Sequence, residues 1–133
     1  MDRRDFQQLS RLRLREARAL LRLRLADGAY YAVECALKAC IAKRTQRHEF
    51  PDKRRAESSH SHNLAQLLNE SGIKQTFAEK AGEDAQFKKY WDFVQLWSEQ
   101  SRYEAHALEE AEAFLRAIND RNHGVLACIR RHW

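Results

Sequence analysis

One proline and four glycines are spread over a chain of 133 residues. Folds built from β-strands spend more of both residues on turns, so this balance favours helices. Apolar residues also recur three or four positions apart through much of the sequence, which is helical spacing. We therefore expect an all-α fold in a single domain over residues 1–133, arranged as an antiparallel up-and-down bundle of four to five helices.

Residues 3–26 alternate arginine and leucine in two places, which alone predicts a strand. The segment lacks β-branched residues and consists mainly of good helix formers, so we expect a helix. Arg13 and Arg24 fall among its apolar positions and need a carboxylate or a route to solvent. At roughly 100° per residue, five other arginines share a sector of about 60°. We call these five the arginine stripe: Arg4, Arg11, Arg15, Arg18 and Arg22.

The arginine stripe belongs to the more basic half of the chain. Net charge is +5, but residues 1–55 hold 15 Lys and Arg against 7 Asp and Glu, a net +8, and the remainder carries −3. A row of guanidinium groups suits a phosphate backbone, since each can bind phosphate through two hydrogen bonds and release counterions. An acidic protein partner, or a solvated face balanced by Glu109, Glu110 and Glu112, fits the same pattern.

Asp27 is placed to cap a second helix over about 28–46. Within this helix, Glu34 and Lys38 form an i, i+4 pair in the favoured order. Its inward positions follow the three-to-four spacing and are Tyr30, Val33, Leu37, Cys40 and Ile41.

The rest of the chain predicts shorter helices. Gly72 is a helix stop, and Gly124 either kinks the last helix or separates one that ends near Asn122 from another that follows. We expect an irregular loop over 47–61, a short helix over 62–70, a loosely helical stretch over 73–84, an aromatic-faced helix over 84–99 and a final helical segment over 104–132.

Arginine–histidine pairs are the candidate catalytic residues. A metal-independent ribonuclease can use an arginine to hold the scissile phosphate and a histidine to move protons near neutral pH. Arg102 and His106 are four residues apart, which places them on one helix face at about 6 Å if the helix has begun by Arg102. Arg116 and His123 are seven apart and also share a face, one turn further away. Ordinary surface residues are the alternative for each pair.

Two histidines in the loop and three tryptophans favour structural roles. His60 and His62 could bind a metal, but no nearby Cys or Asp completes a ligand set, and His62 is placed to cap the helix that follows. We expect no metal and no cofactor. The tryptophans fall on apolar helical stripes, which favours the core or a dimer interface: Trp91, Trp97 and Trp133.

The cysteines and the N-terminal region indicate the compartment. An odd number of cysteines without a CxxC motif, all in apolar helical pattern, is typical of free thiols in a reducing cytosol. No segment approaches the ~20 apolar residues of a membrane span, and the Arg-rich start is unlike a secretory signal. We therefore expect a cytoplasmic protein without membrane contact, with free thiols at Cys35, Cys40 and Cys128.

The segment DGAYYAVECALKACI, which starts at Asp27, resembles the second helix of HEPN domains. An Arg/Leu/Ala helix precedes it, and His62-Asn63-Leu64 is similar to the His-Asp-Leu helix start of that family. Further along, Arg102-Tyr103 resembles the family's Arg-Tyr motif, and Gly124-Val125 completes the order. The resemblance covers nearly the whole chain.

By this resemblance the chain is a helical bundle that forms a homodimer. Family members act as endoribonuclease toxins or as RNA- and nucleotide-associated modules, often in bacterial defence or toxin–antitoxin systems beside a small nucleotidyltransferase. The sequence departs from the family in two motifs: Asn63 replaces the usual Asp, and the spacer between Arg102 and His106 is one residue short of the catalytic one. Its second helix also lacks about one turn. By position we carry over Arg102, Tyr103, Glu34 and Lys38, and we add His106 as a candidate.

The leading hypothesis is a module associated with RNA or a nucleotide-related partner, without established catalysis. One alternative is a metal-independent endoribonuclease that uses Arg102 and His106. Another is a non-catalytic module that docks an acidic protein through its Arg-rich first helix.

Overall fold

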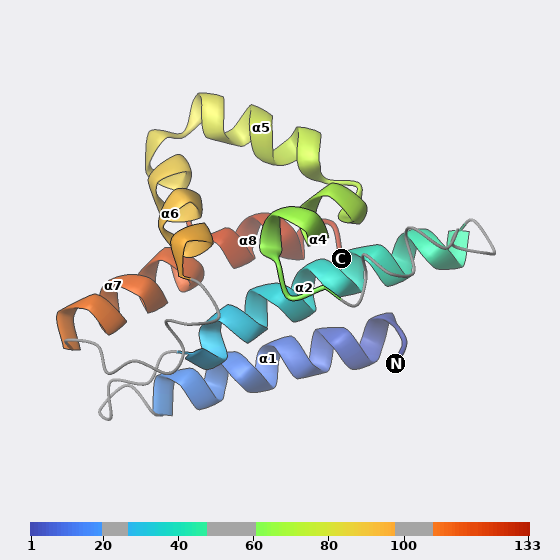
Figure 1. The fold of residues 1–133 in the computed structure, drawn as a ribbon, viewed down its shortest axis with the longest axis horizontal. Helices are drawn as coiled ribbons and strands as arrows, with labels where there is room; N and C mark the ends of the chain where they lie inside the picture. Colours follow the sequence, from blue (N-terminus) through green and yellow to red (C-terminus); the bar gives the residue numbers. More distant parts are fainter. Residues whose placement is uncertain (20–26, 48–60, 98–107) are drawn as a thin grey trace.

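The computed structural model describes residues 1–19, 27–47, 61–97 and 108–133. All regular secondary structure in these ranges is helical, so the all-α class is confirmed (Figure 1). In the same ranges, no helix combines the length and the apolar character that a membrane span requires. In chain order the helices are α1 (Arg3–Ala19), α2 (Asp27–Arg47), α4 (Leu64–Ser71), α5 (Lys74–Glu83), α6 (Ala85–Leu96), α7 (Leu108–Asn119) and α8 (Val125–Arg130).

Helix α2 is central, since it contacts α1, α4, α7 and α8. Figure 1 shows α1 lying along α2. The two are antiparallel, because the Ser10 hydroxyl donates to the Ala32 carbonyl at 2.7 Å while Gly28 lies against Ala17. A Cβ at Gly28 would come within 2.8 Å of the Arg13 carbonyl oxygen, so glycine permits this close approach. The predicted inward positions are all buried: Tyr30, Val33, Leu37, Cys40 and Ile41.

Helix α1 buries a face centred on Ser10, Leu14 and Ala17. At roughly 100° per residue this face lies about a quarter turn around the helix from the arginine stripe. The stripe therefore lies beside the buried face and not on the opposite side of the helix. Arg13 finds the carboxylate it needs, with Nη1 2.8 Å from Glu16 Oε2. Leu20, Arg22, Leu23 and Arg24 lie outside the described residues.

Helix α4 runs parallel to α2. Near one end the Tyr30 hydroxyl donates to the His62 carbonyl at 3.0 Å, and near the other Arg44 Nη1 donates to the Glu70 carbonyl at 2.9 Å. Gly72 then adopts φ +84 and ends α4, as predicted.

The described ranges hold more helices than the four to five expected, because local caps divide two segments. The loosely helical stretch over 73–84 is a regular helix, α5, and Asp84 separates it from α6 by capping the new helix through a 3.0 Å bond from the Phe87 N–H. The final segment is broken and not kinked: α7 ends at Asn119 and Gly124 precedes α8.

The predicted aromatic face of α6 is confirmed and lies in the core. Phe77 of α5 meets Phe87 and Trp91 edge to face, with ring centroids 5.2 and 4.9 Å apart. Trp97 stacks on Phe114 of α7 at 3.9 Å. Both tryptophans are buried, so they fix the packing of α5, α6 and α7.

Candidate functional site

A histidine held by a buried glutamate is the most distinctive polar contact on α2. His62 Nδ1 lies 2.7 Å from Glu34 Oε1. The side chain of Glu34 is 2% exposed, whereas that of His62 is 50% exposed. Burying a carboxylate is costly unless it is paired and hydrogen-bonded, so this contact specifies where the imidazole lies.

The backbone around His62 is also fixed. Tyr30 donates its hydroxyl to the His62 carbonyl, and the Tyr31 ring meets the imidazole at 6.4 Å with an angle of 67° between their planes. Asn63, and not His62, caps α4: its side chain accepts from the Gln66 N–H at 3.0 Å. The predicted capping role of His62 is therefore wrong, because the adjacent residue takes it and frees the imidazole to meet Glu34.

The geometry of this pair suits proton transfer. A carboxylate only accepts hydrogen bonds, so its contact places a proton on Nδ1 of His62 and leaves Nε2 with the lone pair in the neutral ring. A half-exposed imidazole with an oriented Nε2 can take a proton from a hydroxyl and return it to a leaving group. We call His62 and Glu34 the α2 dyad.

The charged neighbours of the α2 dyad correct one expectation. Among the ion pairs of the described residues, Glu34 pairs with His62 and Lys38 takes part in none, so the predicted Glu34–Lys38 pair is wrong. Burial carries Glu34 away from the solvent side on which an i, i+4 pair would form. Burial, and after it the Glu34 charge, raise the pKa of the neighbouring Cys35 thiol, while Lys38 and Arg13 lower it, and the net result is a pKa of about 11.

All three cysteines are free and buried, as predicted. Burial raises the pKa of Cys40 to about 12 and that of Cys128 above its ordinary value. Thiolates are the reactive form, so these side chains act as small apolar groups of the core. Within the described part of the chain, no cluster of three or more His, Cys, Asp or Glu side chains could hold a metal ion.

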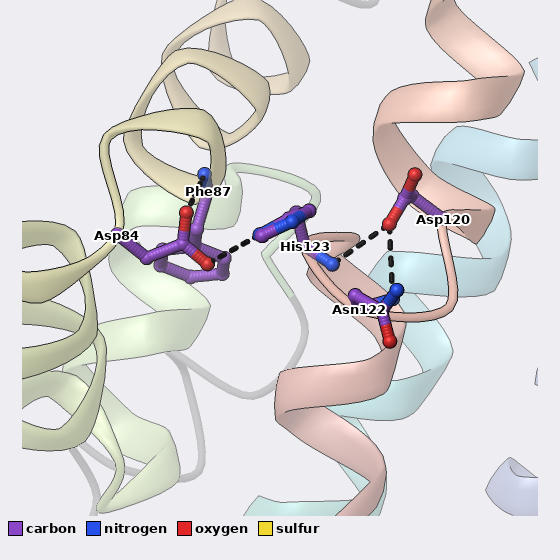
Figure 2. A network of polar contacts seen from close by, with 5 residues as sticks. All are labelled: Asp84, Phe87, Asp120, Asn122 and His123. Atoms are coloured by element: carbon purple, nitrogen blue, oxygen red, sulfur yellow. Dashed lines mark hydrogen bonds and ion pairs between the residues drawn. The ribbon is translucent and has the colours of Figure 1, made fainter.

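A second histidine–carboxylate pair joins two helix junctions (Figure 2). His123 Nδ1 lies 2.7 Å from Asp84 Oδ2, while Asp84 Oδ1 caps α6. Asp120 Oδ1 accepts from the N–H groups of Asn122 and His123 at 2.9 and 2.8 Å. Contact with His123 lowers the pKa of Asp84, and the His123 N–H bond lowers that of Asp120. We call His123 and Asp84 the junction pair.

The junction pair also bears on the prediction that Arg116 and His123 share one helix face. The two residues were expected on one continuous helix face, but α7 ends at Asn119 between them. His123 turns to Asp84, and Arg116 is exposed on α7. The prediction is wrong because the cap at Asp120 interrupts the helix.

The arginine stripe meets an aromatic ring from the far end of the chain. The guanidinium carbon of Arg11 lies 4.9 Å from the centroid of the Trp133 ring, and that of Arg130 lies 5.6 Å from it. Burial lowers the pKa of Arg130, and the charges of Arg11 and Arg18 lower it further. None of the ion pairs formed by the described residues includes these three arginines. We call Arg11, Arg18, Arg130 and Trp133 the arginine surface.

The remaining predicted site residues divide into two groups. Arg4 and Arg15 are exposed on α1, as the stripe requires. Outside the described residues lie Arg22, His60, Arg102, Tyr103 and His106.

Comparison with known proteins adds no assignment: no family model, curated protein or solved structure matches this chain. Two contacts of the site were missed from sequence, His62 with Glu34 and Arg11 with Trp133. The first left a signal, because Glu34 falls between apolar positions that α2 buries and therefore needs a polar partner.

Proposed function

We propose that this chain is a HEPN-like cytoplasmic module that associates with RNA through the arginine surface. The observation that carries the proposal is that Arg11 and Arg130 lie over the Trp133 ring, with the charge of Arg18 also acting on Arg130. Among the ion pairs of the described residues, none includes any of these three arginines. Burial is the main cause of the lowered pKa of Arg130, and repulsion from the like charges of Arg11 and Arg18 lowers it further. A chain of phosphates relieves this repulsion and releases its own counterions.

The aromatic ring favours RNA over an acidic protein as the partner. Proteins that bind single-stranded nucleic acids combine basic side chains along the backbone with aromatic rings on which bases stack. Trp133 is half-buried, and its ring already lies under two guanidinium groups. Guanidinium planes themselves stack on bases in RNA complexes. An acidic protein would neutralise the charge but would make no use of the ring.

Binding to a short single-stranded RNA tests the proposal. Replacing Arg11 and Arg18 by Gln removes two charges from the surface and keeps good helix formers. We expect affinity at low salt to fall at least about tenfold, because each lost contact is a charge-assisted hydrogen bond to phosphate. The matched control replaces exposed Lys89 and Arg121 by Gln, which removes the same charge elsewhere. Equal losses in both variants would contradict a defined surface.

A second candidate function is metal-independent RNA cleavage, favoured by the α2 dyad. His62 would accept the proton of an RNA 2′-hydroxyl, and Glu34 would hold the imidazole in the required orientation. The family resemblance adds Arg102 as the group that holds the scissile phosphate. Cleavage in the presence of EDTA, lost on Arg102→Ala as well as on His62→Gln, would join these residues in one site.

The family resemblance alone adds two further parts to the proposal, a homodimer and a nucleotidyltransferase as protein partner. Sedimentation of the purified chain measures the first directly. A monomer at micromolar concentration would remove the dimer from the proposal and leave RNA binding to be judged separately.

A further inference from the structure

A basic pocket of about 310 Å³ lies between α2, the junction of α4 and α5, and His132. Two cationic side chains of α2, Lys43 and Arg44, line it together with His132. Among the described residues, no acidic side chain contributes to its lining. The pocket is separate from the α2 dyad, because Arg44 and Glu34 are ten residues apart on one helix, which is roughly 15 Å.

Both cations are held in place by neutral partners. Lys43 Nζ lies 3.3 Å from the His132 carbonyl oxygen, and Arg44 Nη1 donates to the Glu70 carbonyl at 2.9 Å. Neither appears among the ion pairs of the described residues. A carbonyl fixes the side chain but leaves its charge uncompensated, and each group keeps further N–H donors for a ligand.

The helix stop at Gly72 makes room for the guanidinium. Gly72 has φ +84, and a Cβ there would come within 2.7 Å of Arg44 Cδ and 3.1 Å of its Nε. The turn that ends α4 therefore also packs against the arginine that lines the pocket. Ile73, the next residue, also lines the pocket and offers no side-chain cap to α5.

We propose that this pocket binds a phosphate monoester of a small molecule, with Arg44 and Lys43 on the phosphate. A planar guanidinium beside a lysine ammonium is the pair that proteins use for phosphate, since one supplies two aligned donors and the other a compact charge. The volume lies at the lower end of the range for small-molecule sites and exceeds what a free phosphate needs. The inference goes beyond RNA association and does not depend on it.

Calorimetric titration of the full chain at fixed ionic strength tests this pocket with three probes: ribose 5-phosphate, ribose and inorganic phosphate. We expect ribose 5-phosphate to bind and ribose to bind at least about tenfold more weakly, since the charged hydrogen bonds supply most of the affinity. Absence of ribose 5-phosphate binding would overturn the proposal. Inorganic phosphate bound as tightly as the monoester would overturn the monoester and leave a free-anion site.

Three variants locate the binding. Arg44→Gln and Lys43→Gln should each weaken ribose 5-phosphate at least about tenfold, and circular dichroism melts check that each variant folds. The variant Arg11→Gln with Arg18→Gln should bind the probe as the parent does. The same loss in that variant as in Arg44→Gln would assign the probe to the arginine surface and overturn the pocket, whatever the outcome for RNA.

Discussion

Two histidines of this chain meet carboxylates with the same geometry, Nδ1 to oxygen at 2.7 Å, yet the two pairs occupy different kinds of place. In the junction pair, Asp84 uses its second oxygen to cap α6, and the contact ties the α5–α6 junction to the turn before α8. In the α2 dyad, Glu34 lies inside a continuous helix and caps nothing. The first carboxylate is part of the framework, whereas the second mainly orients an imidazole.

This difference shows that the carboxylate's position in its helix indicates the role of the pair. An Asp at a helix start is stabilised locally, because it accepts a hydrogen bond from a backbone N–H group of the same helix. A buried Glu in mid-helix accepts no such capping bond. The cost of its desolvation must therefore be offset by its hydrogen bond with His62 and by the neighbouring structure. We therefore expect replacement of either histidine to lower stability, and only replacement of His62 to affect cleavage.

The largest expected effect is on RNA cleavage. If the α2 dyad transfers protons, His62→Gln should lower the rate in EDTA by about 10²–10⁴. It should also lower the melting temperature, because it removes the hydrogen-bond partner of the buried Glu34 carboxylate. His123→Gln should leave the rate unchanged and lower the melting temperature. Parent-like cleavage by the His62 variant, or no cleavage by the parent at any pH from about 6 to 8, where an ordinary histidine titrates, would remove this candidate function.

The next effect is on stability at the junction pair. Asp84→Ala removes the cap of α6 and the partner of His123, so the melting temperature should fall by roughly 3–6 °C. Asp84→Asn retains an acceptor for the Phe87 N–H and should lose less. Asp92→Ala, which removes only the exposed contact with Lys88, is the control. Equal losses for Asp84 and Asp92 would contradict a structural joint.

The smallest effect is the acid dependence of that joint. The pKa of both Asp84 and Asp120 lies below the ordinary 3.8 in the folded chain. A lowered pKa gives stability that is present above the unfolded value and is lost as pH falls through the folded one. The melting temperature should therefore drop as pH falls below about 4. In Asp84→Asn the drop should be shallower, and an unchanged profile would contradict the assignment.

The predictability of these features follows the range of the interactions. The inward face of α2, the stop at Gly72 and the aromatic face of α6 arise from spacing within one helix, and all three were predicted. Caps that compete within a few residues were harder: Asn63 displaced His62, and Asp120 broke the last helix.

Contacts between distant segments could not be predicted, because nothing local specifies them. Glu34 and His62 are 28 residues apart, so the sequence suggested Lys38 as the nearest partner for the glutamate. Helical spacing located the arginine stripe, but it could not show that Trp133 lies against Arg11. The pocket depends on the same kind of long-range placement, since His132 meets Lys43 across 89 residues.

The central claim, RNA association through the arginine surface, is tested most directly by the salt dependence of binding. For single-stranded RNA the slope of log K against log salt is about −0.7 for each phosphate neutralised, so three arginines predict about −2 or steeper. In the variant with Arg11→Gln and Arg18→Gln, the slope should be shallower by about 1.4, while the Lys89 and Arg121 control keeps the parent slope. A flat response in the parent, or the same slope in all three proteins, would contradict the claim.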